Sequence, residues 1–484
     1  MIHTVLATPL QSPIGVCMPP PLNIDCSFHS DAKMGRTSYT NKFFFTLCLG
    51  YFPYKAKLMK KQGFMYMLIA MILVPFSIIA QQKDSFLLIQ ADRLFDGEQM
   101  RIGWGILVYQ NKIVAVGETS TLLAKAPLKK IDLKGKTLLP GLIEGHSHLL
   151  LHAYNEAKWN EQVLQESLAE RVARGVNHAK ATLMAGFTTV RDLGTEGADY
   201  ADVGLKKAIE NQIIPGPRMI IATKAIVATG SYGPKLENTS HHIIKGAAEA
   251  DGAEGLTREA RNQIGNGADL IKVYADYRWG INDSAQPTFT LDELKTLVAV
   301  VNSSGRKVVA HASTEEGMKR AAVAGVSTIE HGDYGSSEVY DLMIRNKVAL
   351  CATLSAPEAS ASYNGWNKKT MPPTDRVIQK KKSFKLALEK GVTICFGGDV
   401  GVYPHGDNAR EMELMVEYGM NPVEVLKSAT SVNADVFGFE KTIGRLRPGL
   451  LADIIAVEGN PAEKISAVRN IAFVMKDGTI YYQQ

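Results

Sequence analysis

Residues 137–148 read Thr-Leu-Leu-Pro-Gly-Leu-Ile-Glu-Gly-His-Ser-His. The stretch holds a short apolar run, a Pro-Gly step and two histidines two residues apart. A short apolar run bounded by turn residues is typical of a buried strand. In an extended segment, residues two apart point to the same side, so His146 and His148 can reach one ion. Imidazole is a preferred ligand of zinc and similar metals. The stretch therefore predicts a strand whose last residues include two ligands of one metal ion.

Seven further apolar segments follow this one at intervals along the chain. The stretches between them, such as 161–184, 291–303 and 314–324, have helical spacing of Leu, Val and Ala, and Thr290 with Glu293 forms a capping-box start. Strands that alternate with helices pair in parallel, and eight such units predict an α/β fold of the (β/α)8 TIM-barrel class, with its chemistry at the C-terminal strand ends. The eight predicted strands are residues 137–144, 188–192, 218–222, 269–274, 307–310, 326–330, 348–353 and 392–396.

Both ends of the region that contains these segments look like β structure. Strand-like runs lie between residues 86 and 116 and again between 452 and 482, where Asp477-Gly478 is a strong hairpin signal. We predict a small β-sandwich domain assembled from both ends of the mature chain, residues 84–139 and 441–484. The metal-dependent hydrolase barrel would then occupy residues 140–440.

The N-terminal region predicts export. Met59-Lys-Lys-Gln62 precedes an apolar run that ends at Ala80, which predicts a signal peptide over residues 59–80. An uncleaved anchor is the alternative for this run. Residues 1–58 show no clear periodicity, and we expect them to be disordered or to come from a start codon assigned too far upstream. The mature protein is then expected to be periplasmic or secreted, with the membrane involved only through the signal segment.

Composition excludes some classes of partner. The 484-residue chain is 45% hydrophobic and 21% charged, with a net charge of only +5, which is ordinary for a globular enzyme. Basic residues are scattered among acids, so we expect no nucleic-acid partner. A small-molecule substrate and a homo-oligomer are expected instead. Cys351 and Cys395 lie in predicted strands, as buried free thiols or, alternatively, as a disulfide between neighbouring strands.

Lys272 lies inside the apolar segment Asp269-Leu-Ile-Lys-Val-Tyr274. Burial disfavours the charged ammonium and lowers its pKa, which leaves neutral amine. A neutral amine can add CO2 to become a carbamate, an anionic ligand with two oxygens that can bridge two metals. Taken alone, the residue could equally be a lysine that extends to solvent or a barrel-core ion pair.

Three more predicted strands end in residue types that bind metals. His311 ends the fifth strand, His331 the sixth, and Asp399 follows Gly397-Gly398 at the end of the eighth. Each of these residues alone could be a packed, capping or turn residue. The C-terminal ends of the strands meet on one rim of a barrel, so the six residues together predict a metal centre. These residues are His146, His148, Lys272, His311, His331 and Asp399.

These motifs resemble the amidohydrolase superfamily, and within it the imidazolonepropionase-like branch that includes Xaa-Pro dipeptidases (prolidase-like enzymes). The resemblance covers roughly residues 85 to 484. It is carried by Pro140-Gly-Leu-Ile-Glu-Gly-His-Ser-His148, Thr188-Thr-Val-Arg-Asp-Leu-Gly194, Leu270-Ile-Lys-Val-Tyr274, His311-Ala-Ser313, Ile329-Glu-His-Gly332, Phe396-Gly-Gly-Asp399 and Ile443-Gly-Arg-Leu-Arg-Pro-Gly449 with Ala452-Asp453.

The resemblance implies two divalent metal ions, zinc being the expected metal. His146, His148 and Asp399 would bind one ion, His311 and His331 the other, and carboxylated Lys272 would bridge them. A hydroxide between the ions would be the nucleophile, and Asp399 would act as general acid and base.

The substrate is less closely specified. We expect a C–N amide bond in a small peptide-like substrate, a dipeptide or an N-acyl amino acid. Two alternatives are hydrolysis of a cyclic amide or lactone at the same site, and a non-catalytic metal-binding homologue. Ser313 stands where some similar enzymes carry a tyrosine that holds the substrate carboxylate. The candidate substrate-binding residues are Tyr232, Tyr274, Arg278, Ser313 and His152.

Overall fold

A computed structural model describes residues 86–122, 128–235 and 243–484. The predictions for residues 1–58 and for the signal peptide over 59–80 lie outside these described residues. Within the described ranges, no helix combines the length and the apolar character that a bilayer crossing would need.

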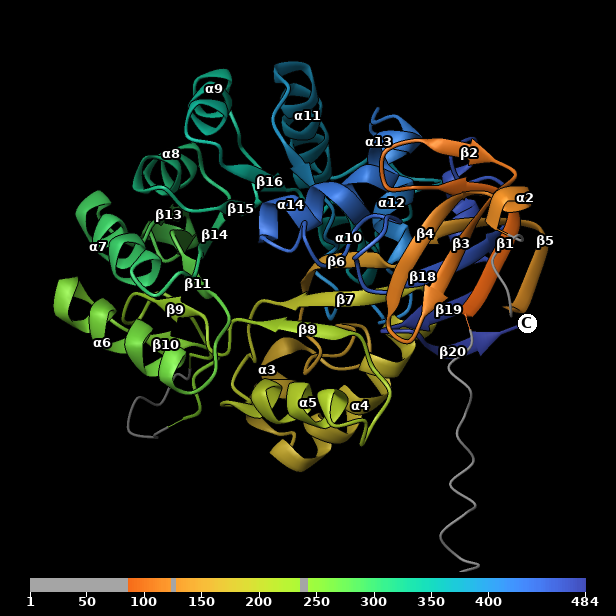
Figure 1. Ribbon diagram of the computed structural model, residues 1–484. Coiled ribbons are helices and arrows are strands. Elements are labelled where there is room, and N and C mark those ends of the chain that lie inside the picture. Colours follow the sequence, from red (N-terminus) through yellow and green to blue (C-terminus); the bar gives the residue numbers. More distant parts are fainter. Residues whose placement is uncertain (1–85, 123–127, 236–242) are drawn as a thin grey trace, which may run out of the picture. The chain divides into compact units, whose positions relative to one another are not determined.

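The strands near the start and the end of the described chain join in one sheet. The order in this sheet is β20-β19-β18-β5-β1-β3-β4, with β2 paired to β1. Strands from the two ends, orange and blue in Figure 1, therefore lie side by side, with β18 against β5. The strands are β1 (Phe86–Phe95), β2 (Met100–Ile102), β3 (Trp104–Tyr109), β4 (Lys112–Glu118), β5 (Leu128–Pro140), β18 (Ile454–Glu458), β19 (Ile471–Lys476) and β20 (Thr479–Gln483).

The predicted hairpin at Asp477-Gly478 is confirmed. β19 and β20 pair antiparallel across it, and both turn residues have positive φ, 50° at Asp477 and 75° at Gly478. Two consecutive left-handed residues are the mark of a two-residue hairpin turn, and Asp-Gly supplies them at low steric cost.

The middle of the chain forms parallel strands. One sheet contains β6, β7 and β8, and a second has the order β10-β9-β11-β14-β15-β16-β17. Backbone hydrogen bonds link the two sheets at both junctions: Asp269 N donates to Ile221 O (2.8 Å), and Gly145 N donates to Phe396 O (3.1 Å). The strands are β6 (Leu142–Ser147), β7 (Phe187–Asp192), β8 (Arg218–Ile221), β9 (Ile226–Val227), β10 (Ala248–Glu249), β11 (Ile271–Tyr274), β14 (Val308–Ala312), β15 (Thr328–His331), β16 (Ala349–Cys351) and β17 (Ile394–Cys395).

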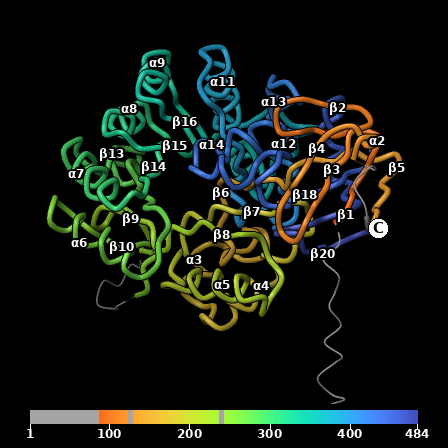
Figure 2. The backbone as a smooth tube through the Cα atoms, in the orientation of Figure 1, coloured from red at the N-terminus to blue at the C-terminus, as the bar shows by residue number. Residues whose placement is uncertain are grey.

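Helices lie outside these parallel strands, as Figures 1 and 2 show for α4 to α9 and α11. Both the strands and the inward helix faces are apolar, and they share the largest buried core. The helices are α2 (Thr119–Leu122), α3 (Trp159–Leu164), α4 (Leu168–Met184), α5 (Ala201–Glu210), α6 (Gly252–Gly265), α7 (Leu291–Asn302), α8 (Glu315–Ala324), α9 (Ser337–Arg345), α10 (Ser355–Tyr363), α11 (Asp375–Lys390), α12 (Ala409–Glu417), α13 (Pro422–Lys427) and α14 (Asn433–Phe437). The short strands β12 (Asp276–Arg278) and β13 (Ala285–Pro287) form a hairpin after β11.

Local signals set the ends of several helices. The capping box predicted at Thr290 and Glu293 is present, because each side chain accepts from the backbone N–H of the other. α8 and α11 end at Gly325 and Gly391, both left-handed, as is usual where a helix gives way to a strand.

Two predicted elements are wrong in their extent. Residues 137–144 are not one strand, because β5 ends at Pro140 and β6 begins at Leu142 in another sheet. At the step between them, a Cβ on Gly141 would lie 2.1 Å from Thr188 Oγ1, so only glycine fits. The helical stretch 161–184 is likewise divided into α3 and α4, since Ser167 caps a new helix by accepting from Glu170 N.

Candidate metal centre

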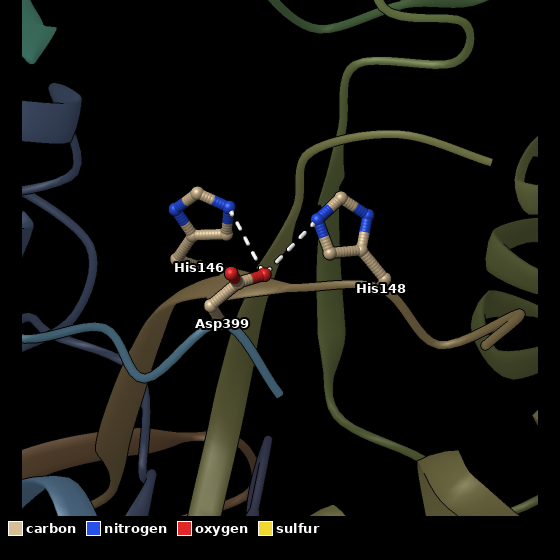
Figure 3. Close-up of side chains that lie close together, drawn as sticks. All are labelled: His146, His148 and Asp399. Carbon is tan, nitrogen blue, oxygen red and sulfur yellow. Dashed lines mark ion pairs between the residues drawn. The ribbon is translucent and has the colours of Figure 1, made fainter. Parts of the chain in front are cut away.

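Two histidines at the end of β6 converge on one carboxylate that follows β17. His146 Nε2 lies 3.5 Å and His148 Nε2 3.4 Å from the same oxygen, Asp399 Oδ1. Figure 3 shows the two rings on either side of the carboxylate. The three ligand atoms lie within 4.8 Å of one another, close enough to share one metal ion. The structure therefore brings together residues more than 250 positions apart in the sequence.

In three of the histidines, the Nδ1 atom already has a hydrogen-bond partner. His148 Nδ1 donates to Gly194 O, and His146 Nδ1 to Glu330 Oε2, both at 2.9 Å. His331 Nδ1 contacts Thr353 Oγ1 at 2.8 Å. These partners orient the rings and leave Nε2 as the atom that can bind a metal, which is the usual arrangement around metal-binding histidines.

Glu330 is the centre of a buried polar network below the histidines. Besides His146, it accepts from Arg191 Nη2 (2.8 Å) and Thr328 Oγ1 (2.5 Å). Burial alone would raise the pKa of Glu330, but Arg191 and His146 hold it well below its usual range. A permanently ionised carboxylate thus fixes the orientation of His146 from behind.

A second set of atoms near Glu330 does not fit a metal as well. His146, Glu330 and Cys351 also offer ligand atoms within 4.8 Å of one another. However, this face of His146 is hydrogen-bonded to Glu330, and burial raises the pKa of the Cys351 thiol well above its usual value. A neutral thiol is a poor metal ligand. Cys351 and Cys395 are both buried and free, which confirms the prediction of free thiols.

The other predicted ligands continue the group of histidine rings. His146 and His331 have ring centroids 5.1 Å apart, and His331 and His311 have centroids 4.4 Å apart. Lys272, on β11 beside His311 on β14, is 1% exposed. Burial is the largest cause of the lowered pKa of Lys272. The structure thus places a buried amine with a lowered pKa near three of the imidazoles, because its charge acts on His146, His311 and His331.

Backbone geometry marks two of these residues. His331 and Asp399 have φ of 78° and 62°, in the left-handed region that non-glycine residues seldom adopt. Such conformations cost on the order of 1–3 kcal/mol each and concentrate at functional sites. The glycines before Asp399 answer a different need, since a Cβ on Gly397 would lie 2.5 Å from Cys351 Sγ and one on Gly398 2.0 Å from Tyr403 Oη.

The pKa values of the two β6 histidines move in opposite directions. Burial and the nearby Lys272 lower the pKa of His146 to about 4. Burial also disfavours the charged form of His148, but its hydrogen bond to Asp399 and the charge of Glu196 raise its pKa to about 9. The two rings thus face different charges, since the positive charge of Lys272 acts on His146 and the negative charge of Glu196 acts on His148.

The centre lies at a cavity of about 400 Å³. Of the candidate substrate-binding residues, Tyr232, Tyr274, Arg278 and Ser313 line this cavity. The structure places His152 outside the lining, where its two nitrogens contact Glu156 and Glu166, each at 2.8 Å. Its imidazole is engaged in this local cluster because Glu156 lies in the loop after β6 and Glu166 in the turn between α3 and α4.

Several residues that line the cavity were not among the candidates proposed from the sequence. The lining also includes Tyr154, Glu196, Asp276, Tyr277, Asp333 and Arg376. Asp276 and Asp333 follow β11 and β15, so their place after predicted strand ends could have marked them. Glu196 lies four residues beyond β7, in a loop whose course only the folded chain reveals.

A model of the amidohydrolase family matches residues 137–481. The chain belongs to the amidohydrolase family. Among curated proteins, ochratoxinase of Aspergillus niger is 29% identical over 436 residues, 84% of this chain and 89% of the relative. The family and this relative support hydrolysis of an amide C–N bond.

Two similar solved structures are those of a dipeptidase and a prolidase. A Xaa-Pro dipeptidase with methionine bound in its active site is 32% identical, with a TM-score of 0.72 over 82% of this chain and 100% of that one. A prolidase complexed with N-methylphosphonate-L-proline is 28% identical, with a TM-score of 0.71 over 83% of this chain and 100% of that one. These likenesses imply the predicted TIM barrel with an added sheet domain, and they join the chain to the prolidase-like branch.

Proposed function

We propose that this protein is a binuclear metal-dependent hydrolase that cleaves the amide bond of a small peptide-like substrate, a dipeptide or an N-acyl amino acid. One observation carries the proposal: two imidazole Nε2 atoms converge on Asp399 Oδ1 beside the buried amine of Lys272. The family and the names of the similar dipeptidase, prolidase and ochratoxinase support the same class of reaction.

The donor set fits two divalent cations such as zinc. His146, His148 and Asp399 would hold one ion, and His311 and His331 the other. Lys272 would bridge them after its neutral amine attacks CO2 and loses a proton, which gives a carbamate with two oxygens. Its burial and lowered pKa support this step, because only the neutral amine can attack.

The protein side chains divide the work of hydrolysis. When bound, the cations would supply a water acidic enough to ionise near neutral pH and would polarise the scissile carbonyl. The pKa of Asp399 is held below its usual range by His146 and His148 despite burial, so the carboxylate is ionised and would be the group that accepts the proton from the attacking water. Asp399 then returns this proton to the leaving amine. Arg278, which lines the cavity, would hold a substrate carboxylate, and its permanent charge and planar donors support this role.

Two wider features belong to the same proposal. The hydrogen bonds at both junctions of the parallel sheets support a closed (β/α)8 barrel, with the β5 and β18 sheet as the second domain. The signal-like segment 59–80 supports export of the mature chain to the periplasm or beyond.

The test is a substrate screen of the mature protein loaded with zinc. Dipeptides, N-acyl amino acids and acyl lactones would be compared, with metal content measured on the same sample. We expect about two zinc ions per chain and turnover of amides, abolished by a chelator and restored by zinc. Lys272→Ala should lose activity and regain part of it when short carboxylic acids replace the carbamate. One ion or none, or turnover of lactones only, would overturn the proposal.

A further inference from the structure

Glu196, a buried acid in the lining of the cavity, has a carboxylate oxygen that no hydrogen bond within the described part of the chain accounts for. Glu196 is 2% exposed and lines the cavity of the metal centre. Its Oε2 accepts from Tyr232 Oη (2.7 Å) and Trp159 Nε1 (3.0 Å). Its Oε1, among the described residues, has no hydrogen-bond partner. A buried carboxylate oxygen left in this state costs free energy, so its retention indicates a ligand that completes it.

The structure holds Glu196 firmly in this position. Arg171, itself buried, donates to the backbone carbonyls of Glu196 (2.7 Å), Thr195 (3.0 Å) and Leu150 (3.1 Å). Glu196 also has a φ of 49°, in the left-handed region. A strained residue whose own carbonyl and preceding carbonyl are both held by a buried arginine resembles a preorganised binding group more than a solvated loop residue.

The surroundings favour a cation as the missing partner. The N–H groups of Arg171 donate to backbone carbonyls, so its guanidinium does not pair with the side-chain carboxylate of Glu196. Aromatic rings stand next to Glu196: Tyr232 packs on Trp159, Tyr274 and Tyr277, with ring centroids between 4.8 and 5.1 Å apart. This aromatic wall keeps water away from the carboxylate on that side, so a charged ligand group would meet it in a setting of low polarity, where an ion pair is strong.

The distance to the metal centre suits one particular ammonium group. Glu196 Oε1 lies 3.9 Å from His148 Nδ1, on the far side of the ring whose Nε2 faces Asp399. In a dipeptide, the α-nitrogen and the scissile carbonyl carbon are only about 2.5 Å apart, as backbone bond lengths require. A substrate whose carbonyl lies at the centre therefore carries its α-amine close to the centre, and Glu196 is a buried carboxylate of the cavity lining that lies next to His148.

Resting on the proposed hydrolase function, we propose that Glu196 Oε1 binds the free α-ammonium group of the substrate, so that the enzyme is an amine-dependent dipeptidase and not an N-acyl amino acid hydrolase. An N-acylated substrate presents a neutral amide to Glu196 in place of an ammonium group, so the buried carboxylate gains no charged partner, which costs affinity. Glu196 is thus a specificity-determining residue.

An alternative role for Glu196 would be to tune His148. However, the Nδ1 proton of His148 already goes to Gly194 O at 2.9 Å, a shorter contact than the 3.9 Å to Glu196. The two roles differ in a measurable way. Loss of a tuning group would slow free-amine and N-acylated substrates equally, whereas loss of an ammonium-binding group would act on the free-amine substrate alone.

The experiment compares Xaa-Pro and Xaa-Leu dipeptides with their N-acetylated forms, in the zinc-loaded protein and in Glu196→Gln. We expect the wild-type protein to prefer the free amine in kcat/KM by about tenfold or more, and Glu196→Gln to remove most of that preference through a higher KM. Tyr232→Phe should weaken the preference in the same direction, because it removes one donor to Glu196. Glu166→Gln, which alters a carboxylate outside this cavity, should not change it.

A binding measurement keeps this inference separate from the proposed reaction. Calorimetry with L-leucinamide and N-acetyl-L-leucinamide needs no turnover. We expect leucinamide alone to bind, and its affinity to fall about tenfold or more in Glu196→Gln. If no peptide is hydrolysed but leucinamide binding depends on Glu196, the proposed hydrolysis fails and the ammonium site stands. Equal binding of both amides, or an unchanged free-amine preference in Glu196→Gln, would overturn the inference.

Discussion

At the scale of single residues, the site depends on side chains that could do little alone. His146 is a ligand candidate because Glu330 occupies its Nδ1, and Glu330 is ionised because Arg191 pairs with it. Asp399 reaches both histidines only because two glycines before it tolerate contacts that a Cβ would prevent. The sequence motif predicts these residue types, and the folded chain supplies the reasons for them.

The substitution Asp399→Asn tests this dependence. The amide keeps the size of the side chain and one oxygen for a metal, but it cannot accept and return a proton. We expect most of the bound zinc to remain and kcat to fall by roughly 10²–10⁴-fold, the usual contribution of a general acid–base group. Metal analysis and steady-state kinetics on the same sample would check both expectations. A variant that turns over at the wild-type rate would remove Asp399 from the proton transfer.

At the scale of elements, the loops after the parallel strands place the chemistry and the helices support them. α5 shows how a helix start is tied to a neighbouring strand end. Asp202, in the first turn of α5, accepts from Val203 N (2.9 Å) and from Thr223 N (3.0 Å), just beyond β8. Its carboxyl is fully buried, and burial is the largest cause that raises its pKa from 3.8 to about 8.

This shift predicts a pH dependence of stability. Because the pKa of Asp202 is higher in the folded chain than in the unfolded chain, the folded state binds the proton more tightly. Its contribution to the free energy of unfolding is therefore present at low pH and is lost as pH rises from about 4 to about 8. Asp202→Asn carries no titrating group, so it should lose less stability than the wild type between pH 5 and pH 8. Urea unfolding of both proteins at several pH values would show this, and parallel profiles would contradict it.

At the scale of the whole molecule, charged side chains link the sheet that contains β5 and β18 to the parallel strands. Arg218, at the start of β8, donates to Asp453 (2.6 Å) just before β18 and to Asp477 (2.5 Å) in the hairpin turn. Thr188, in β7, also reaches Asp453, at 3.4 Å. The side chain of Asp453 is 3% exposed, so this junction is largely closed to water.

Loss of this arginine should destabilise the folded chain. Arg218→Ala leaves Asp453 buried without its charged partner, and we expect a loss of about 2 kcal/mol or more in the free energy of unfolding. Lys136→Ala is the matched control, because Lys136 pairs with the half-exposed Glu458 and such pairs contribute less than about 1 kcal/mol. Chemical denaturation of both variants would compare them, and equal losses would show that Arg218 does not fasten the junction.

Patterns among residues that are close in the sequence predicted many of the local elements of this protein. Apolar runs predicted the parallel strands, Thr290 and Glu293 a helix start, and Asp477-Gly478 a hairpin, because each depends on neighbours in the chain. The family and its metal-binding residue types could also be recognised from motifs. The break at Pro140-Gly141 was missed, since the apolar run continues across it while the chain passes from one sheet to another. Only tertiary structure set His152 apart from the cavity, gave Glu330 its partners and brought Glu196 beside His148. Those outcomes depend on contacts between distant segments, and hydrophobic periodicity carries no information about which loops meet.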